Sequence, residues 1–298
     1  MGFHATVLLV NGAISLVFAS VALVGSTIMI IAVVKNPLNV IRKPLHSIED
    51  TGLVLSFLVG TVLLPYFGVT EILQGVKNNS DSLDFPSVVL LFTDFLIASK
   101  LAVQLGINIE RHLAYVHPQF HRAKVTNRAT FFTSLLCVTF FFLFSCLSFS
   151  GIDEKIYYIV SLHVCCTCSW FLFVLVSWLT YLKLKNRENS IRTAPAEPNQ
   201  LPQAREKADF ERARNVLAAK RHLQKLAKNY MPLVISIIPW YIIKCVAIAC
   251  KICLENKAGF LSQLITIPLA FVTDVYYPVW RIFNGKYRNT VKYILCGN

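Results

Sequence analysis

Ionisable side chains interrupt the long apolar stretches of this 298-residue chain. Asp94, Lys100, Lys244 and Asp274 each stand among aliphatic and aromatic residues. A charged group at the centre of a bilayer costs about 2.5–3.5 kcal/mol on insertion scales, so such residues are functional candidates by default. The chemistry that they offer is charge pairing and the binding of a polar or zwitterionic ligand.

A second reactive cluster, Glu110-Arg111-His112, follows the apolar stretch that contains Lys100. An arginine at a membrane boundary keeps its methylene groups in hydrocarbon, while its guanidinium reaches an adjacent carboxylate, backbone carbonyls and water. The alternative interpretation of Arg111 is a plain electrostatic anchor at the cytosolic surface.

Apolar segments must position these groups. The composition is 55% hydrophobic and 15% charged, with a mean hydropathy of +0.56, whereas soluble domains carry about 25% charged residues. A membrane helix needs about 20 mostly apolar residues. Segments of this length predict an all-α membrane protein, a seven-transmembrane helix bundle, with spans over Thr6–Val34, Thr51–Ile72, Pro86–Ile109, Thr130–Ser150, Ile156–Leu182, Tyr230–Cys250 and Phe260–Phe283. No basic stretch precedes the first span, so we expect it to be retained and not removed as a secretory signal.

The distribution of basic residues predicts the orientation. Most of the 29 Lys and Arg residues fall in loops on one side of the predicted bundle, and the other side holds only Lys77, Lys155, Lys251 and Lys257. The positive-inside rule then predicts a multi-pass plasma-membrane protein with its N-terminus outside and its C-terminus in the cytoplasm. The net charge of +13 is thus a topology signal, and we expect no nucleic-acid partner.

The segments on the cytoplasmic side differ in character. Residues 1–283 form the predicted seven-transmembrane domain, and its inner stretch Asn186–Gln203, with three prolines, is predicted to be a flexible linker. From Ala204 to Tyr230 apolar residues recur at helical spacing, so we expect the sixth helix to extend into the cytosol. Residues 284–298 predict an amphipathic helix on the lipid bilayer, with Cys296 as a palmitoylation candidate.

The run from Glu110 to Pro118 identifies a family. Glu110-Arg111-His112, followed by Pro118 in the next loop, resembles the end of the third helix in the rhodopsin-like (class A) G-protein-coupled receptors. Leu58-Val59-Gly60, Leu64-Pro65-Tyr66, Gly25-Ser26, Pro239 and Asp274-Val-Tyr-Tyr-Pro278 are similar to motifs of its other helices. The chain resembles a divergent member over all seven spans, in order.

The resemblance implies a signalling mechanism. Glu110 would hold Arg111 at rest, and Arg111 with His112 would meet a heterotrimeric G protein when the sixth helix moves outward. Pro239 and Pro278 would act in the conformational switch. Lys220, Arg221 and Lys225 would line the opened cavity, or would be solvated charges without that role.

Several family positions are altered. The aspartate of the sodium site aligns with Ser56, while Lys100 and Asp274 align with two serines of the same pocket. We therefore hypothesise that the Lys100 ammonium replaces the sodium ion, with Asp274 as its counter-ion and Ser56 as a hydrogen-bond partner. The alternative is an unpaired Lys100 that faces a water-filled cavity.

Other candidates concern ligands and covalent sites. Thr93, Asp94, His163, Trp240 and Lys244 lie near the family's ligand pocket, although Asp94 alternatively forms a local pair and Trp240 alternatively packs in the core. Asn78 begins the only Asn-x-Ser/Thr sequon, used or unused. Because Pro86 stands where the family has its disulfide cysteine, the remaining candidates are Cys250 and Cys253, as a disulfide or as free thiols.

Three functions compete. The leading one is a receptor for an unknown extracellular ligand that acts on a heterotrimeric G protein, and it is not an enzyme and needs no cofactor or metal. The second is a receptor-like protein that binds or scaffolds without coupling. The third is a transporter, which would predict inverted repeats and broken helices. Nucleotide exchange, with an ion-flux control, separates them.

Overall fold

The chain folds into a bundle of long helices. The computed structural model describes residues 3–35, 44–77, 87–193, 202–249, 265–283 and 285–296, and every regular element within them is helical. In chain order these elements are α1 (Phe3–Lys35), α2 (Pro44–Leu58), the π-helical η1 (Val59–Leu63), α3 (Leu64–Lys77), α4 (Ser87–Val116), α5 (Pro118–Lys124), α6 (Asn127–Cys146), the short 3₁₀ turn η2 (Leu147–Phe149), α7 (Glu154–Ser161), the π-helical η3 (Leu162–Thr167), α8 (Cys168–Thr193), α9 (Pro202–Ala249), α12 (Val272–Phe283) and α13 (Gly285–Cys296).

The helices have the length and composition of membrane spans. Five stretches are long and apolar enough to cross a bilayer, namely Ala5–Lys35, Asp50–Val76, Leu91–Val116, Asn127–Phe149 and Ile159–Ser190, and Tyr230–Val246 is a shorter apolar helix. These confirm the prediction of an all-α membrane protein. The predicted seventh span begins outside the described residues, and its described part is helical over residues 265–270 and again in α12.

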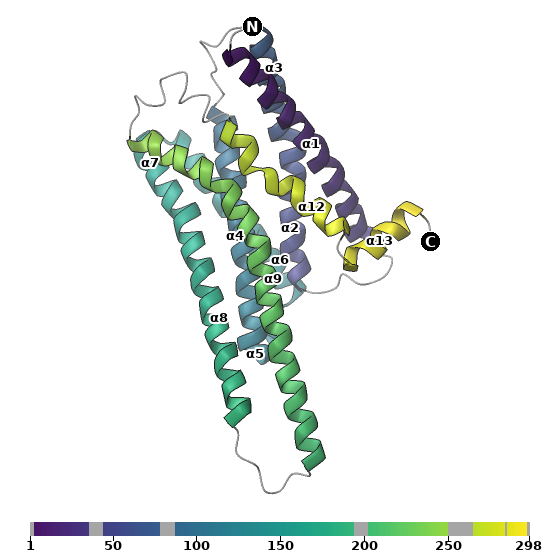
Figure 1. Cartoon of the computed structure of the whole chain (residues 1–298). Coiled ribbons are helices and arrows are strands. Elements are labelled where there is room, and N and C mark those ends of the chain that lie inside the picture. Colours follow the sequence, from purple (N-terminus) through teal and green to yellow (C-terminus); the bar gives the residue numbers. More distant parts are fainter. Residues whose placement is uncertain are drawn as a thin grey trace.

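The two ends of the bundle are distinct. Figure 1 shows the N-terminus and α7 at one end, and α5 with the projecting ends of α8 and α9 at the other. The expected extension of the sixth helix is present, because α9 is one helix of 48 residues. Pro232 and Pro239 lie within it, and each removes a backbone hydrogen bond from the helical ladder.

Two predicted boundaries are wrong. The helix of the third span continues past Ile109 to Val116, so the Glu110-Arg111-His112 run lies within the C-terminal part of α4 and does not follow the helix. The predicted linker Asn186–Gln203 begins as helix, because α8 continues to Thr193. The first proline of that stretch is Pro195, and a proline disfavours helix at the residue before it, so nothing breaks the helix earlier.

Close backbone packing joins the first two long helices. A Cβ atom at Gly60 would lie 2.7 Å from the backbone nitrogen of Leu23, and one at Gly68 would lie 2.7 Å from Cγ of Leu16. Small residues permit such approach where lipid supplies no hydrophobic driving force between helices. Beside this contact, Asn11 donates hydrogen bonds of 2.9 and 3.0 Å to both carboxylate oxygens of the fully buried Glu71.

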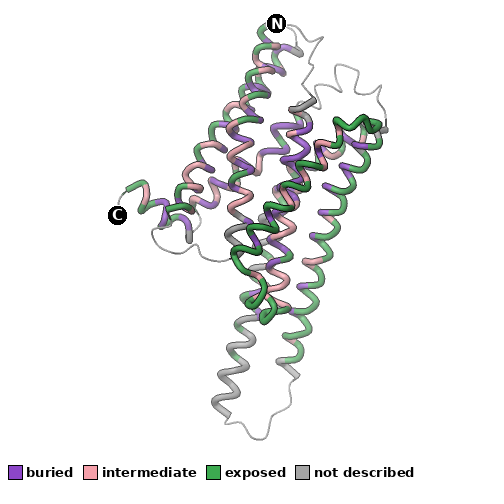
Figure 2. The backbone as a smooth tube through the Cα atoms, turned by 180° about the vertical axis from the view of Figure 1, so that it is seen from behind, coloured by how far each residue is buried: buried purple, intermediate pink, exposed green. Residues whose placement is uncertain are grey.

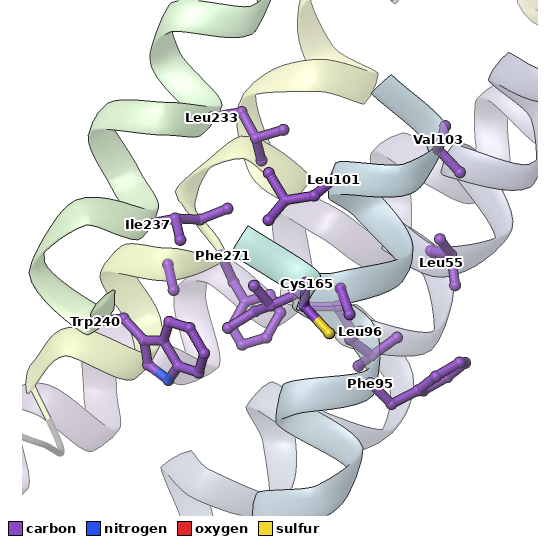
Figure 3. Packing of buried hydrophobic residues seen from close by; sticks show 14 of the residues in the cluster. Leu55, Phe95, Leu96, Leu101, Val103, Cys165, Leu233, Ile237, Trp240 and Phe271 are labelled. Atoms are coloured by element: carbon purple, nitrogen blue, oxygen red, sulfur yellow. The ribbon is translucent and has the colours of Figure 1, made fainter. Parts of the chain in front are cut away.

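The apolar core lies between α2, α4, α9 and the segment of residues 267–271. Figure 2 shows buried residues on the inward sides of the helices and exposed residues along the outward sides. Figure 3 shows Phe271 at the centre of this cluster, with Leu101 and Ile237 on one side of it, Leu96 on another and the aromatic ring of Trp240 nearby. This core surrounds the charged residues described below.

The amphipathic helix that follows the last predicted span is present as α13. Tyr287 and Val291 are buried against Met29 of α1 and Leu53 of α2, while Leu295 is exposed. Part of the predicted lipid-facing side therefore packs on the bundle. Cys296 is exposed and free, as acylation requires.

A pair of glycine variants tests the close packing of the bundle. Gly60→Ala places a methyl group on the backbone of α1, and such overpacking costs about 1–3 kcal/mol. Gly106→Ala is the matched control, because its new Cβ would lie 3.6 Å from Ile48, an ordinary contact. We expect thermal unfolding in detergent to start several degrees earlier for Gly60→Ala, and no earlier than wild type for Gly106→Ala. Equal melting of the two variants would contradict the packing described.

Candidate functional site

A buried ion pair lies in the middle of the bundle. The Lys100 ammonium, on α4, forms a salt bridge with the Asp274 carboxylate, on α12. Ser56, on α2, donates a hydrogen bond of 2.8 Å to the other oxygen of that carboxylate. The ammonium also lies 4.2 Å from the ring centroid of Phe271, so an aromatic face covers it. All three predicted residues of this group therefore meet.

The local fold explains the position of Asp274. The helical residues 265–270 end at a turn on Phe271, whose amide donates to the carbonyl of Pro268, and α12 starts at Val272. Asp274 thus stands in the first turn of a helix, where the helix dipole favours a negative charge. The start of α12 at Val272 therefore favours a carboxylate at this position.

A small cavity adjoins the pair. It has a volume of about 40 Å³, and Ser56, Lys100 and Asp274 line it together with Gln104 and Tyr277. Such a space holds a few water molecules. Asp274 is 2% exposed and Lys100 7% exposed, so bulk water compensates neither charge and each depends on the other for charge compensation. Removing one partner of such a pair leaves an uncompensated buried charge, at about 3–5 kcal/mol.

A second buried ion pair lies between α4 and α9. The Lys244 ammonium is 3.6 Å from the Asp94 carboxylate, and it lies 5.6 Å from the ring centroid of Trp240. The structure therefore brings together three of the predicted ligand-pocket residues, namely Asp94, Trp240 and Lys244. Thr93 is buried and donates to the carbonyl of Val89 in its own helix. His163 is exposed instead, and its ring contacts Thr167 at 3.3 Å.

The Glu110-Arg111-His112 run lies at the opposite end of α4. Glu110 is buried, and one of its oxygens is 2.7 Å from Nε2 of His121, on α5. Its other oxygen is 3.6 Å from Nε of Arg111, too long for a hydrogen bond. The expected restraint of Arg111 by Glu110 is thus a weak contact, and His121 is the closer partner. His112 lies 2.7 Å from the hydroxyl of Thr180, on α8.

Further polar contacts join α8 to this end of α4 and α9 to α8. Arg187, on α8, donates to the backbone carbonyls of Tyr115 and Val116 at 2.6 and 3.0 Å. Lys220, on α9, forms an ion pair with Glu188, on α8. Arg221 is exposed. Lys225 lies in α9, and its side chain is outside the described part of the structure.

A buried arginine lies three residues after Pro278, one of the two predicted switch residues. Arg281, in α12, donates a hydrogen bond of 2.6 Å to the hydroxyl of Tyr287 in α13. Its guanidinium also lies 5.1 and 4.5 Å from the rings of Tyr277 and Tyr287. Pro278 lies inside α12 beside this group. A Cβ atom at Gly25 would lie 3.0 Å from Cβ of Pro278.

The structure adds polar residues that the sequence predictions omitted. Glu71 is a carboxylate inside an apolar stretch, and the rule that selected Lys100 also selects it. His121 and Arg187 carried no such signal, because both lie in polar surroundings and only the fold brings them to α4. Asn78, Cys250 and Cys253 lie outside the described residues. Among the residues that the structure does describe, no cluster of three or more His, Cys, Asp or Glu side chains suits a metal.

Comparison with known proteins adds no family: no family profile matches the chain, and no curated protein matches it significantly.

The candidate site consists of three polar clusters along α4, near Asp94, near Lys100 and near Glu110. These clusters can pair charges and exchange hydrogen bonds between helices.

A double-mutant cycle tests the central ion pair. Lys100→Met and Asp274→Asn alone each leave a buried polar group without its partner, so we expect each to lower the free energy of unfolding by about 3–5 kcal/mol. The double variant should lose clearly less than the sum, with a coupling of about 0.5–3 kcal/mol. Thermal unfolding of the four proteins in one detergent measures this.

The control is Lys183→Met, because Lys183 is an exposed lysine of α8. It should melt like the wild type. Additive losses in the double variant would show that the two side chains do not depend on each other.

Proposed function

We propose that this protein is a divergent class A G-protein-coupled receptor of the plasma membrane, which relays an extracellular ligand to a heterotrimeric G protein. The proposal includes seven spans, with the N-terminus outside. One observation carries it: Glu110-Arg111-His112 lies on α4 beside the helices α8 and α9, which project beyond the bundle at that end (Figure 1). Polar contacts join α8 to the end of α4 and α9 to α8. This matches the place that a G protein would need.

The projecting end can open at low cost. The Lys220–Glu188 pair is about one-third exposed on the Glu188 side, and exposed ion pairs contribute about 0–1 kcal/mol. Pro239 removes one hydrogen bond from the interior of α9, so the helix bends there with less resistance. Outward movement of α9 would break the pair with α8 and expose Arg111 further, which is 30% exposed in this structure.

The ligand would act through the far end of the same helices. Asp94 and Lys244 link α4 to α9 with opposite charges at 3.6 Å. A ligand that carries its own charges competes for both side chains, and so it weakens the link between these helices. A polar or zwitterionic ligand is therefore the class that this pair suits. The Lys100–Asp274 pair stays in place and keeps α12 on α4 during the movement.

The test is guanine-nucleotide exchange on purified heterotrimers by the full chain in lipid nanodiscs. Wild type should accelerate exchange on at least one heterotrimer class, and Arg111→Ala should abolish this. Glu188→Gln should raise the basal rate about two- to fivefold, because it removes one exposed ion pair. Ser190→Ala is the matched control on α8, since that hydroxyl bonds the carbonyl of Asn186 in its own helix.

Absence of exchange with every heterotrimer, together with an unchanged cellular response in Arg111→Ala, would overturn the proposal and favour a non-coupling binding protein. Ion flux through the reconstituted chain would favour a transporter.

A further inference from the structure

A buried carboxyl lies between α1 and α3, apart from the three polar clusters along α4. Glu71 is fully buried and belongs to the candidate span Asp50–Val76. Asn11, in the candidate span Ala5–Lys35, donates to its two oxygens at 2.9 and 3.0 Å. This contact joins two helices inside the apolar part of the bundle, and neither the ion pairs nor the proposed coupling uses it.

The two helices pack closely around this carboxyl. A Cβ atom at Gly12 would lie 2.8 Å from the backbone oxygen of Gly68 and 3.2 Å from Cβ of Glu71. A Cβ atom at Gly75, one turn further along α3, would lie 3.1 Å from the backbone oxygen of Ala5. The backbones of α1 and α3 therefore approach each other on both sides of Glu71, and this close packing keeps bulk water away from it.

Glu71 differs from the other buried carboxyls in the charge of its partner. Asp94 and Asp274 each face a lysine ammonium, and Glu110 faces a guanidinium and an imidazole. The group that contacts Glu71 among the described residues is the side-chain amide of Asn11, which is neutral. An amide dipole compensates a full negative charge much less than a cation does.

No described charge faces Glu71 from the elements packed against it. The main neighbours of α3 are α1 and η1, and η1 carries no ionisable residue. The described ionisable side chain of α1 is Lys35, which lies about 36 Å along the helix from Asn11, at 1.5 Å per residue. On α3 itself, Tyr66 is exposed. Residues 265–271 carry no ionisable side chain.

We infer that Glu71 is a proton-binding site, which joins α1 to α3 as the neutral acid. An isolated carboxylate inside an apolar interior takes up a proton, because keeping the charge there costs far more. The acid keeps its contacts with Asn11, since its carbonyl oxygen and its hydroxyl oxygen can each still accept a hydrogen bond. The inference holds whether or not the protein couples to a G protein.

The proton links this contact to pH. When α1 separates from α3 and water reaches Glu71, the O–H bond breaks, the electron pair stays on the carboxylate and the proton passes to water. The closed contact thus holds one more proton than the open one. A state that holds more protons is disfavoured as pH rises, so the contact between α1 and α3 weakens in alkaline solution.

Infrared difference spectra of the full chain in nanodiscs test the protonation state. The difference between wild type and Glu71→Gln at neutral pH should show loss of a protonated carboxyl band. Glu188→Gln is the matched control, because that carboxylate pairs with Lys220, and it should show loss of an ionised band. Asn11→Ser should keep the protonated band and shift it, since the shorter side chain no longer bonds both oxygens.

Loss of an ionised band in Glu71→Gln would overturn the inference. So would an unshifted protonated band in Asn11→Ser. Because Asn11→Ser leaves Glu71 in place, this second comparison stands even when Glu71→Gln does not fold.

Thermal unfolding in one detergent, from about pH 6 to about pH 8, tests the link to pH. A glutamate exposed to water is ionised over this range, so unfolding releases the proton of Glu71. Wild type should therefore lose stability relative to Glu71→Gln as pH rises, by at most about tenfold in the unfolding equilibrium constant per pH unit. The other titrating groups are common to both proteins and cancel. A difference that stays constant with pH, or that grows in favour of wild type, would contradict the inference.

Discussion

The pair between Lys100 and Asp274 is the constraint on which the bundle depends. Two nearly fully buried charges lie in the middle of an apolar core, and they are tolerable only when each satisfies the other. This requirement fixes the register of α12 against α4, and the hydrogen bond from Ser56 extends it to α2. The turn at Phe271 lets α12 start at Val272, which places the carboxylate in the first turn of a helix.

Polar contacts set helix positions along the whole of α4, because apolar packing alone discriminates weakly between registers in lipid. Asp94 joins it to α9 at one level, Lys100 joins it to α12 in the middle, and His112 joins it to α8 near the other end. The Lys100–Asp274 and Lys244–Asp94 pairs are both buried, with side chains that are at most 8% exposed.

The sequence predicted the helices well and their contacts unevenly. Hydropathy found the five spanning helices, and the positions of Lys100, Asp274 and Ser56 in a family pattern predicted a group that the structure brings together. The end of α4 at Val116 and the extension of α8 to Thr193 were missed, because helix propensity continues beyond the apolar stretch. His121 could not be predicted as the partner of Glu110, since the angle at which α5 leaves α4 follows from packing and not from residue spacing.

The ionisation state of Asp274 tests the central claim most directly. An infrared difference spectrum between wild type and Asp274→Asn, recorded in lipid, isolates the signal of this one side chain. A salt-bridged carboxylate predicts loss of an ionised carboxylate band, and the band should shift in Ser56→Ala, where one hydrogen bond is missing. Loss of a protonated carboxyl band instead would mean that Asp274 is neutral, and that no ion pair holds α12 to α4.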